Sequence, residues 1–323
     1  MNRLRKRGEP EVLGAGGAVD VHQHLWPEAL IEALRARRRP PRLRGWTLEL
    51  PGEPDYKVDP ATHDVVARAA QVRADGLDLA LVAPSSPLGI EWLAPEEAGK
   101  LLGAYHDGVV ALPAPFGGWA AACLSEIDPV ALGRELDRGF VGLQLPATAL
   151  LDAGAYERVT PLLELLEDTD RPLLVHPGAV AGSGAVAPAW WPAIVSYVQQ
   201  MHAAWFAFRA YGRPRHPALR VCFAMLAGLA PLHGERVAAR TGDRNVVDED
   251  VFLEISSYGT KAVDATIRVL GIDALVNGSD RPYAEPAGLD LGAAGLQALR
   301  GGNPMRLLYG REVTHELAIA ARA

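Results

Sequence analysis

The sequence of 323 residues predicts a single (β/α)8 barrel of the α/β class, the TIM-barrel fold. Short apolar runs bounded by turn residues alternate with amphipathic stretches, which is typical of parallel strands joined by helices. No GxGxxG pattern follows the first run, so a dinucleotide-binding doubly wound sheet is disfavoured. The polar residues suited to chemistry lie near the ends of the first, fifth and last runs, and a barrel brings strand ends together at one mouth.

The expected strands are a set of nearly continuous apolar runs, as in strands covered on both faces. They lie at residues 17–24, 78–85, 109–116, 141–147, 172–178, 219–228, 251–257 and 273–280. Helices are expected between them, for example at residues 60–75, 95–106 and 156–168, where apolar residues recur at helical spacing.

Residues 1–16 are expected to form a flexible tail, and residues 17–323 the barrel. Two connections, at roughly 25–77 and 179–218, exceed ordinary loop length and should carry helices or function of their own. The second is rich in aromatic residues and resembles a helical insertion over the barrel mouth. Packing is the favoured role for these aromatic side chains, with substrate lining as the alternative.

Composition limits the class of protein. With 49% hydrophobic and 22% charged residues the chain can bury a large core, which excludes extended disorder. The formal charge of −7 is modest and gives no sign of a nucleic-acid partner. No stretch approaches about 18 uncharged apolar residues, so no membrane partner is expected and a cytoplasmic location is predicted.

Two smaller features are assigned ordinary roles. Cys123 and Cys222 lack zinc-finger spacing and are expected to be buried small side chains. The segment 35–44 contains six Arg; a solvated loop is favoured, and an anion-attracting rim of the active site is the alternative.

Four residues predict a metal centre. His22 and His24 end the first run one residue apart, so the strand period of two points both to one face. His176 ends the fifth run, and Asp280 closes the last, where a buried carboxylate is costly without a neighbouring cation. Three nitrogen donors and one carboxylate leave an open position, as catalytic sites do. We expect one divalent ion, by default Zn²⁺, with Mn²⁺ or Fe²⁺ using the same ligands.

Other candidates come from strand ends. Trp26 follows the HxH pair and is expected to form an apolar wall for substrate. Arg281 could pair with a substrate carboxylate or with an external acidic residue. Gln144 and Glu254 could face the barrel interior, with hydrogen-bonded scaffolding as the favoured role. His63 and His106 lie in the predicted helices 60–75 and 95–106 and are expected to face solvent.

The motifs VDVHQHLWP, LLVHPG and NGSDRPY, in that order, resemble the metal-binding signatures of the amidohydrolase superfamily. The nearest branch is the amidohydrolase-related group that includes aminocarboxymuconate-semialdehyde decarboxylase and the resorcylate decarboxylases. The segment GGNPMRLLYG resembles the closing motif of that group. The motifs span residues 19–310. The resemblance implies a barrel, a mononuclear site of His22, His24, His176 and Asp280, and either hydrolysis or non-oxidative decarboxylation. It is also the only basis for expecting a homodimer.

One position departs from that pattern. After the sixth strand the group places a His followed by Gly-Gly, whereas this chain reads FAMLAGLAP, with Met225 at the His position. A thioether cannot transfer a proton, so Met225 is a candidate substrate-binding residue instead. His233, eight residues downstream, is a poor geometric substitute.

The leading expectation is a metal-dependent hydrolase of a small carboxylated, cyclic or amide-like substrate, with metal-activated water and Asp280 as the catalytic proton carrier. The alternative is a metal-dependent non-oxidative decarboxylase. A third interpretation is a catalytically impaired barrel that binds a ligand, which Met225 favours and the four retained ligand residues oppose.

Overall fold

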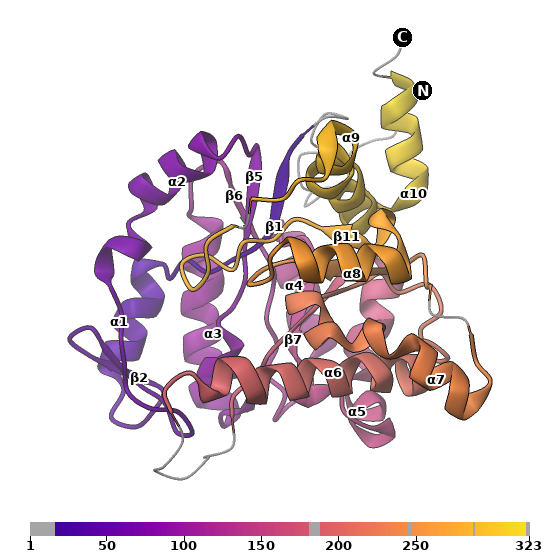
Figure 1. Ribbon diagram of the computed structural model, residues 1–323. Helices are drawn as coiled ribbons and strands as arrows, with labels where there is room; N and C mark the ends of the chain where they lie inside the picture. Colours follow the sequence, from indigo (N-terminus) through magenta and orange to yellow (C-terminus); the bar gives the residue numbers. More distant parts are fainter. Residues whose placement is uncertain (1–16, 181–187, 245–246, 287, 321–323) are drawn as a thin grey trace.

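The computed structural model describes residues 17–180, 188–244, 247–286 and 288–320; the predicted tail, residues 1–16, and the middle of the predicted insertion, residues 181–187, lie outside the described residues. Eight parallel strands form the centre of the structure, surrounded by helices (Figure 1). The strands are β1 (Val19–Gln23), β5 (Leu79–Val82), β6 (Phe116–Gly118), β7 (Leu143–Pro146), β8 (Leu173–His176), β9 (Val221–Phe223), β10 (Val251–Glu254) and β11 (Leu275–Val276).

The strands close into a ring. Regular pairing gives two sheets, β1-β5-β6 and β7-β8-β9-β10-β11. Backbone hydrogen bonds join the sheets at both edges: Ala120 N to Gly142 O at 2.8 Å between β6 and β7, and Val21 N to Asn277 O at 2.9 Å between β1 and β11. The predicted (β/α)8 barrel is therefore confirmed.

The barrel interior is a packed core. Its buried side chains come from every strand: Val19, Val21, Leu81, Ala83, Trp119, Val141, Leu174, Cys222, Phe252 and Val276. Leu307 and Leu308 pack against this cluster. The side chain of Arg220, just before β9, donates to Leu307 O at 2.8 Å, so these residues close the end of the barrel where the strands begin. A catalytic site would therefore lie at the opposite end of the barrel, where the strands finish.

The helices are α1 (Glu28–Ala36), α2 (Val65–Ala74), α3 (Pro95–Val110), α4 (Pro129–Asp137), α5 (Ala153–Asp168), α6 (Tyr197–Ala207), α7 (Gly234–Thr241), α8 (Thr260–Leu270), α9 (Gly292–Gln297) and α10 (Asn303–Ala320). Three of them begin at an aspartate whose carboxylate accepts the backbone N–H three residues on, at 2.8–2.9 Å: Asp64, Asp128 and Asp152. Such caps satisfy amides that lack a partner inside the helix. None of the helices in the described part of the chain is long and apolar enough to span a membrane.

Two predicted strands differ from the observed ones. Residues 109–116 were expected to be a strand, but Val109 belongs to α3 and packs in the core, and β6 begins only at Phe116. Pro113 and Pro115 explain the shift, because proline has no N–H for a strand ladder. The predicted strand 219–228 is also too long, since β9 ends at Phe223.

A left-handed turn ends the sixth strand. Met225, Leu226, Ala227, Gly228 and Leu229 all have φ between 47° and 62°. This conformation costs roughly 1–2 kcal/mol for each residue with a Cβ, so packing must hold it. Leu226 and Ala227 are fully buried, and α6 lies so close that a Cβ on Gly228 would come within 2.6 Å of Val198 O. The turn therefore gives Met225 one fixed direction at the barrel mouth.

The two long connections carry structure of their own. The first holds α1, α2 and a small antiparallel sheet of β2 (Arg42–Arg44), β3 (Thr47–Glu49) and β4 (Tyr56–Lys57). Four of the six arginines of segment 35–44 form ion pairs with glutamates, among them Arg42 and Arg44, which both contact Glu49; this favours the solvated-loop interpretation over an anion-attracting rim. The second connection holds α6, which packs on the turns that follow β7 and β9 and so lies on the mouth side.

Candidate metal centre

A bulge in β1 directs the histidines of the HxH pair. Asp20 pairs with Ala80 and Gln23 with Val82, so β1 contains one residue more than its neighbour over this stretch. The Asp20 carboxylate supports the bulge by accepting the backbone N–H of His22 at 3.1 Å and the side-chain amide of Gln23 at 2.8 Å. Arg68 of α2, outside the barrel, donates to Gln23 at 2.6 Å. Asp20 and Gln23 thus face the helices, while both histidines face the mouth.

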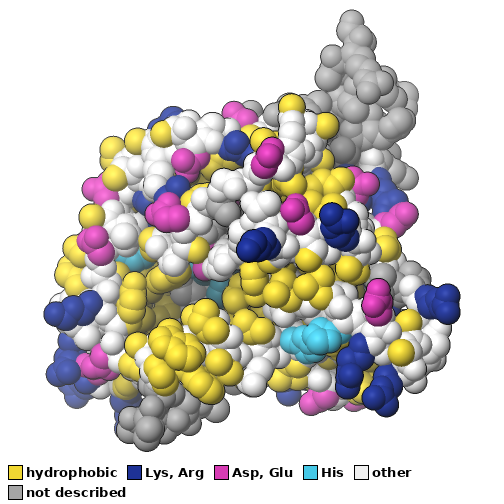
Figure 2. Space-filling view, viewed as in Figure 1, with side chains coloured by type: hydrophobic (Ala, Val, Ile, Leu, Met, Phe, Trp, Pro, Cys, Tyr) yellow, Lys and Arg dark blue, Asp and Glu magenta, His cyan; other side chains and the backbone are white. Residues whose placement is uncertain are grey.

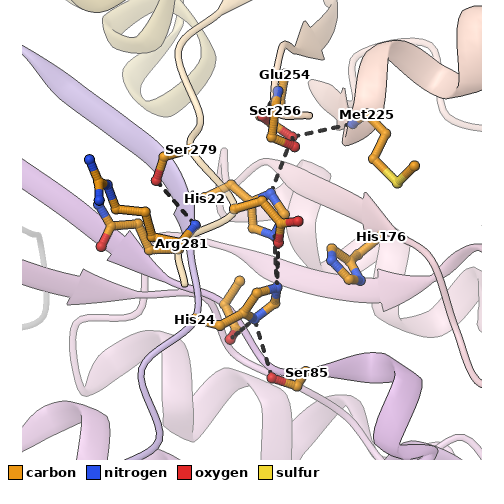
Figure 3. Close-up of polar contacts among 12 residues, drawn as sticks. His22, His24, Ser85, His176, Met225, Glu254, Ser256, Ser279 and Arg281 are labelled. Carbon is orange, nitrogen blue, oxygen red and sulfur yellow. Dashed lines mark hydrogen bonds and ion pairs between the residues drawn. The ribbon is translucent and has the colours of Figure 1, made fainter. Parts of the chain in front are cut away.

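The structure brings the four predicted ligand residues together at the mouth. One ligand atom each from His22, His24, His176 and Asp280 lies within 4.8 Å of the others (Figure 3). The three imidazole rings are 4.8–5.0 Å apart and nearly perpendicular to one another. Asp280 Oδ1 is 3.1 Å from His24 Nε2 and 3.7 Å from His22 Nε2.

The orientation of each imidazole is held from behind. Each Nδ1 lies at hydrogen-bond distance from a fixed acceptor. These contacts are His22 with Glu254 Oε2 at 3.1 Å, His24 with Ala83 O at 3.1 Å, and His176 with Pro177 O at 2.8 Å. Because every Nδ1 donates its proton outward, every Nε2 in a neutral ring presents a lone pair to the centre of the cluster.

This arrangement fits a cation. His22 Nε2 and His24 Nε2 are 3.1 Å apart, and with both Nδ1 atoms protonated neither nitrogen has a hydrogen to share. Two lone pairs and a carboxylate oxygen facing one another in a buried site repel unless a positive charge lies between them. Three imidazole nitrogens and one carboxylate are donors that suit Zn²⁺, Mn²⁺ or Fe²⁺.

The protonation states of His24, His176 and Asp280 agree with this chemistry. Burial, together with the neighbouring imidazoles, lowers the pKa of His24 and of His176, which keeps both rings neutral. Burial also acts to lower the pKa of His22, but the hydrogen bond and charge of Glu254 outweigh it and raise that pKa. For Asp280, burial acts to raise the pKa, and the contacts with His24 and the other two imidazoles lower it overall. Asp280 is therefore ionised, as a ligand must be.

Glu254 links the cluster to the left-handed turn. Its buried carboxylate accepts from His22 Nδ1, from Met225 N at 3.2 Å, from Ser256 Oγ at 2.8 Å and from Ser256 N. Glu254 is thus hydrogen-bonded scaffolding that orients His22. The Met225 backbone faces Glu254, and its thioether projects away from that carboxylate, on the side of His176 (Figure 3).

Trp26 and Arg281 both have partners within the protein. Trp26, predicted as an apolar wall for substrate, is only 2% exposed; its Nε1 donates to Ser85 Oγ at 2.9 Å, and Ser85 contacts His24. Through Ser85, Trp26 therefore supports the imidazole of His24 from behind. Arg281 forms ion pairs with Asp75 at 3.2 Å and Glu285 at 3.0 Å, so the external pairing is observed rather than a guanidinium directed into the cluster.

His63 and His106 were expected to face solvent, and both are buried. His63 Nδ1 accepts the backbone N–H of Trp26 at 3.1 Å and its ring stacks on the indole, while His106 Nε2 accepts from Ala121 N at 3.0 Å. Burial lowers the pKa of each to about 4. Both are neutral structural side chains.

Sequence reasoning missed a group of tyrosines beside the cluster. The ring of Tyr283 lies 5.3 Å from that of His24 and 6.3 Å from that of Tyr56. Tyr197, at the start of α6, donates to Glu53 Oε1 at 2.7 Å. The only local signal was Tyr283 in NGSDRPY, three residues after Asp280. Figure 2 shows hydrophobic side chains gathered around a hollow in this face, with histidine atoms visible inside it.

Beneath the mouth, Gln144 begins a buried polar network. Its Nε2 donates to Pro84 O at 2.7 Å and to Ser86 Oγ at 2.8 Å, and Ser86 in turn donates to Glu91. Glu91 is 1% exposed, and burial raises its pKa to about 7. Gln144 is therefore scaffolding, and Glu91 holds a proton at a pH where an exposed carboxyl does not.

We expect the Glu91→Gln variant to be more stable than the wild type at alkaline pH. The unfolded carboxyl ionises near its model value of 4.5 and the folded one near 7, so wild-type stability is greatest below the first value and falls as the pH rises to the second. The full loss is at most about 3 kcal/mol. Urea unfolding of both proteins between about pH 4 and pH 8 measures the change in the free energy of unfolding. If this free energy varied with pH in the same way in both proteins, the prediction would be contradicted.

No protein-family model and no curated protein sequence matches the chain. Among solved structures, the barrel resembles members of the group that its motifs resemble, so the predicted resemblance is confirmed as a likeness of fold. IDCase of Metarhizium anisopliae has 18% identity and a TM-score of 0.73, over 90% of this chain and 97% of that one. The 5-carboxyvanillate decarboxylase of Sphingomonas paucimobilis has 18% identity and a TM-score of 0.67, over 91% and 99%.

A third structure shows a metal. The 5-carboxyvanillate decarboxylase of Novosphingobium aromaticivorans, complexed with manganese and 4-hydroxy-3-methoxy-5-nitrobenzoic acid, has 18% identity and a TM-score of 0.68, over 94% of this chain and 99% of that one. At this identity the comparison establishes the fold of our chain and no more.

Proposed function

We propose that this chain is a metal-dependent decarboxylase that removes carbon dioxide from a small carboxylic acid without oxidation. The observation that carries the proposal is the convergence of three Nε2 lone pairs and the Asp280 carboxylate at the barrel mouth. Two of the three structures reported above are named as decarboxylases, and one of these holds manganese, which supports this reaction over the expected hydrolysis.

His22, His24, His176 and Asp280 would hold the ion. Mn²⁺ and Zn²⁺ both suit this donor set. When bound, the ion supplies positive charge that attracts a carboxylate and stabilises negative charge as the C–C bond breaks. Glu254, Ala83 O and Pro177 O keep the three imidazoles oriented for it.

The chain itself must then move one proton. In decarboxylation the electron pair of the broken C–C bond stays on the substrate carbon, one proton takes the place of the carboxylate, and carbon dioxide leaves without consumption of water. The Asp280 carboxylate is ionised at rest, so it would first take up a proton from solvent or from a substrate hydroxyl and could then deliver that proton to the carbon. The thioether of Met225 cannot transfer a proton, and decarboxylation needs only the one proton transfer assigned to Asp280.

Hydrolysis is the second candidate, because the same Asp280 carboxylate could take a proton from water and return it to a leaving group. Water would then be consumed and its oxygen would appear in the product. An impaired, ligand-binding barrel is disfavoured by the complete set of four converging donors and by the acceptor behind each imidazole.

The test begins with the protein purified without an affinity tag or chelator. Elemental mass spectrometry should find close to one equivalent of Mn, Zn or Fe, or reloading should restore it. The loaded protein is then incubated in ¹⁸O-water with a panel of hydroxylated and methoxylated benzoic acids and with their amides and cyclic esters. Release of carbon dioxide without ¹⁸O in the product supports the proposal; ¹⁸O in the product would establish hydrolysis, and a protein that cannot be loaded would exclude both.

A further inference from the structure

A hydrogen bond crosses the mouth of the barrel between the two long connections. Tyr197, the first residue of α6, donates its phenol to Glu53 Oε1 at 2.7 Å. Glu53 lies in the first connection, shortly before β4, and 144 residues separate the two partners. Both side chains are half-buried, so the pair is partly open to solvent.

The pair lies close to the metal cluster. Burial raises the pKa of Tyr197, and Glu53, Tyr283 and Asp280 add to the effect. Tyr283 connects the same regions, since its ring contacts that of His24 on one side and that of Tyr56, three residues after Glu53, on the other. Glu53 and Tyr197 therefore border the space in front of the cluster.

The Glu53 carboxylate is available to a ligand. Tyr197 occupies Oε1, while Oε2 accepts no hydrogen bond from the described part of the chain and is not sealed from solvent. No Lys or Arg among the described residues lies within ion-pair distance of Glu53, and burial and Tyr197 are the influences on its pKa.

We propose that Glu53, held in place by Tyr197, recognises the end of the substrate remote from the metal and accepts a hydrogen bond from a hydroxyl or amino group there. The substrate is then a small acid with a donor opposite its carboxylate. A second carboxylate at that end is rejected, because it would face Glu53 without a cation between them. The inference rests on the proposed function in one respect, that the metal centre binds the carboxylate of the substrate.

Binding to the manganese-loaded protein tests the inference without requiring turnover. Calorimetry gives the Kd of four matched acids: 4-aminobenzoate, 4-hydroxybenzoate, benzoate and terephthalate. We expect the two donor-bearing acids to bind about tenfold more tightly than benzoate, since a hydrogen bond to a charged group is among the stronger ones. Terephthalate should bind more weakly than benzoate.

Variants identify the residue responsible. Glu53→Lys should reverse the order, so that terephthalate binds best, and Tyr197→Phe should reduce the preference for donors while leaving benzoate binding unchanged. Glu164→Lys, an equal charge change at an exposed position of α5, should preserve the wild-type order. Metal content and circular dichroism confirm that each variant is folded and loaded.

The outcomes separate this inference from the proposed function. If benzoate binds but Glu53→Lys leaves the order of the four acids unchanged, the role of Glu53 is refuted and the metal centre stands. If the loaded protein binds none of the acids, the proposed carboxylate-binding centre fails, and the inference fails with it.

Discussion

The His22→Ala/His24→Ala double variant is expected to contain no bound metal after purification and to have no measurable turnover. Two of the four converging donors are lost, and the remaining pair, His176 and Asp280, cannot enclose an ion. Loss of an outer hydrogen-bond partner alone typically lowers metal affinity by about 10–100-fold, so the loss of two ligands should exceed that range. Elemental mass spectrometry and a manganese titration of the apoprotein measure the effect.

His233→Ala is the matched control for that variant. His233 is exposed at the end of the turn after β9 and contacts His202 rather than the cluster. Its replacement should leave metal content at the wild-type level. Equal metal loss in the two proteins would show that the ion is held elsewhere or that histidine content alone governs loading.

Asp280→Asn should separate the binding of metal from the transfer of a proton. Asn retains an oxygen donor but carries no titratable proton, so we expect a folded protein with weaker metal binding and a turnover reduced by about 10²–10⁴-fold. The backbone should tolerate the change, because Asp280 has φ of 57° and Asn is among the residues that adopt this left-handed conformation most readily.

Turnover per bound metal is the decisive quantity for Asp280→Asn. It is obtained from single-turnover rates divided by the metal content of the same sample. A normal rate per metal would remove Asp280 from proton transfer and leave it a ligand only. A second variant, Asp280→Ala, should lose metal as well, and this distinguishes the ligand role from the acid role.

Much of this protein could be predicted from local patterns. The succession of apolar runs indicates the barrel, because strands covered on both faces need continuous apolar sequence. The pair His22 and His24, with His176 and Asp280 at later strand ends, indicates the cluster, because a closed parallel barrel brings all strand ends to one mouth. These inferences require only the order of elements along the chain.

Local patterns misled where a neighbour distant in sequence decides the outcome. Trp26 was expected to form an apolar wall for substrate, but Ser85 engages the indole; for Arg281, which was left open between substrate and an external partner, Asp75 and Glu285 engage the guanidinium. Ser85 and Asp75 are reached only after the chain has folded around the barrel, whereas Glu285 lies four residues from Arg281. No spacing in the sequence records which partner a side chain will find.

The sequence alone determined the class of fold and the four residues that converge, because both follow from hydrophobic periodicity and from strand order. Only the tertiary structure decided which residues orient the cluster and which residues lie around it. It places Glu254 behind His22 across 232 residues, Tyr197 on Glu53 across 144, and α6 against the left-handed turn that orients Met225. Such contacts depend on packing between distant segments, which stabilises backbone conformations and hydrogen bonds that no local sequence preference would select.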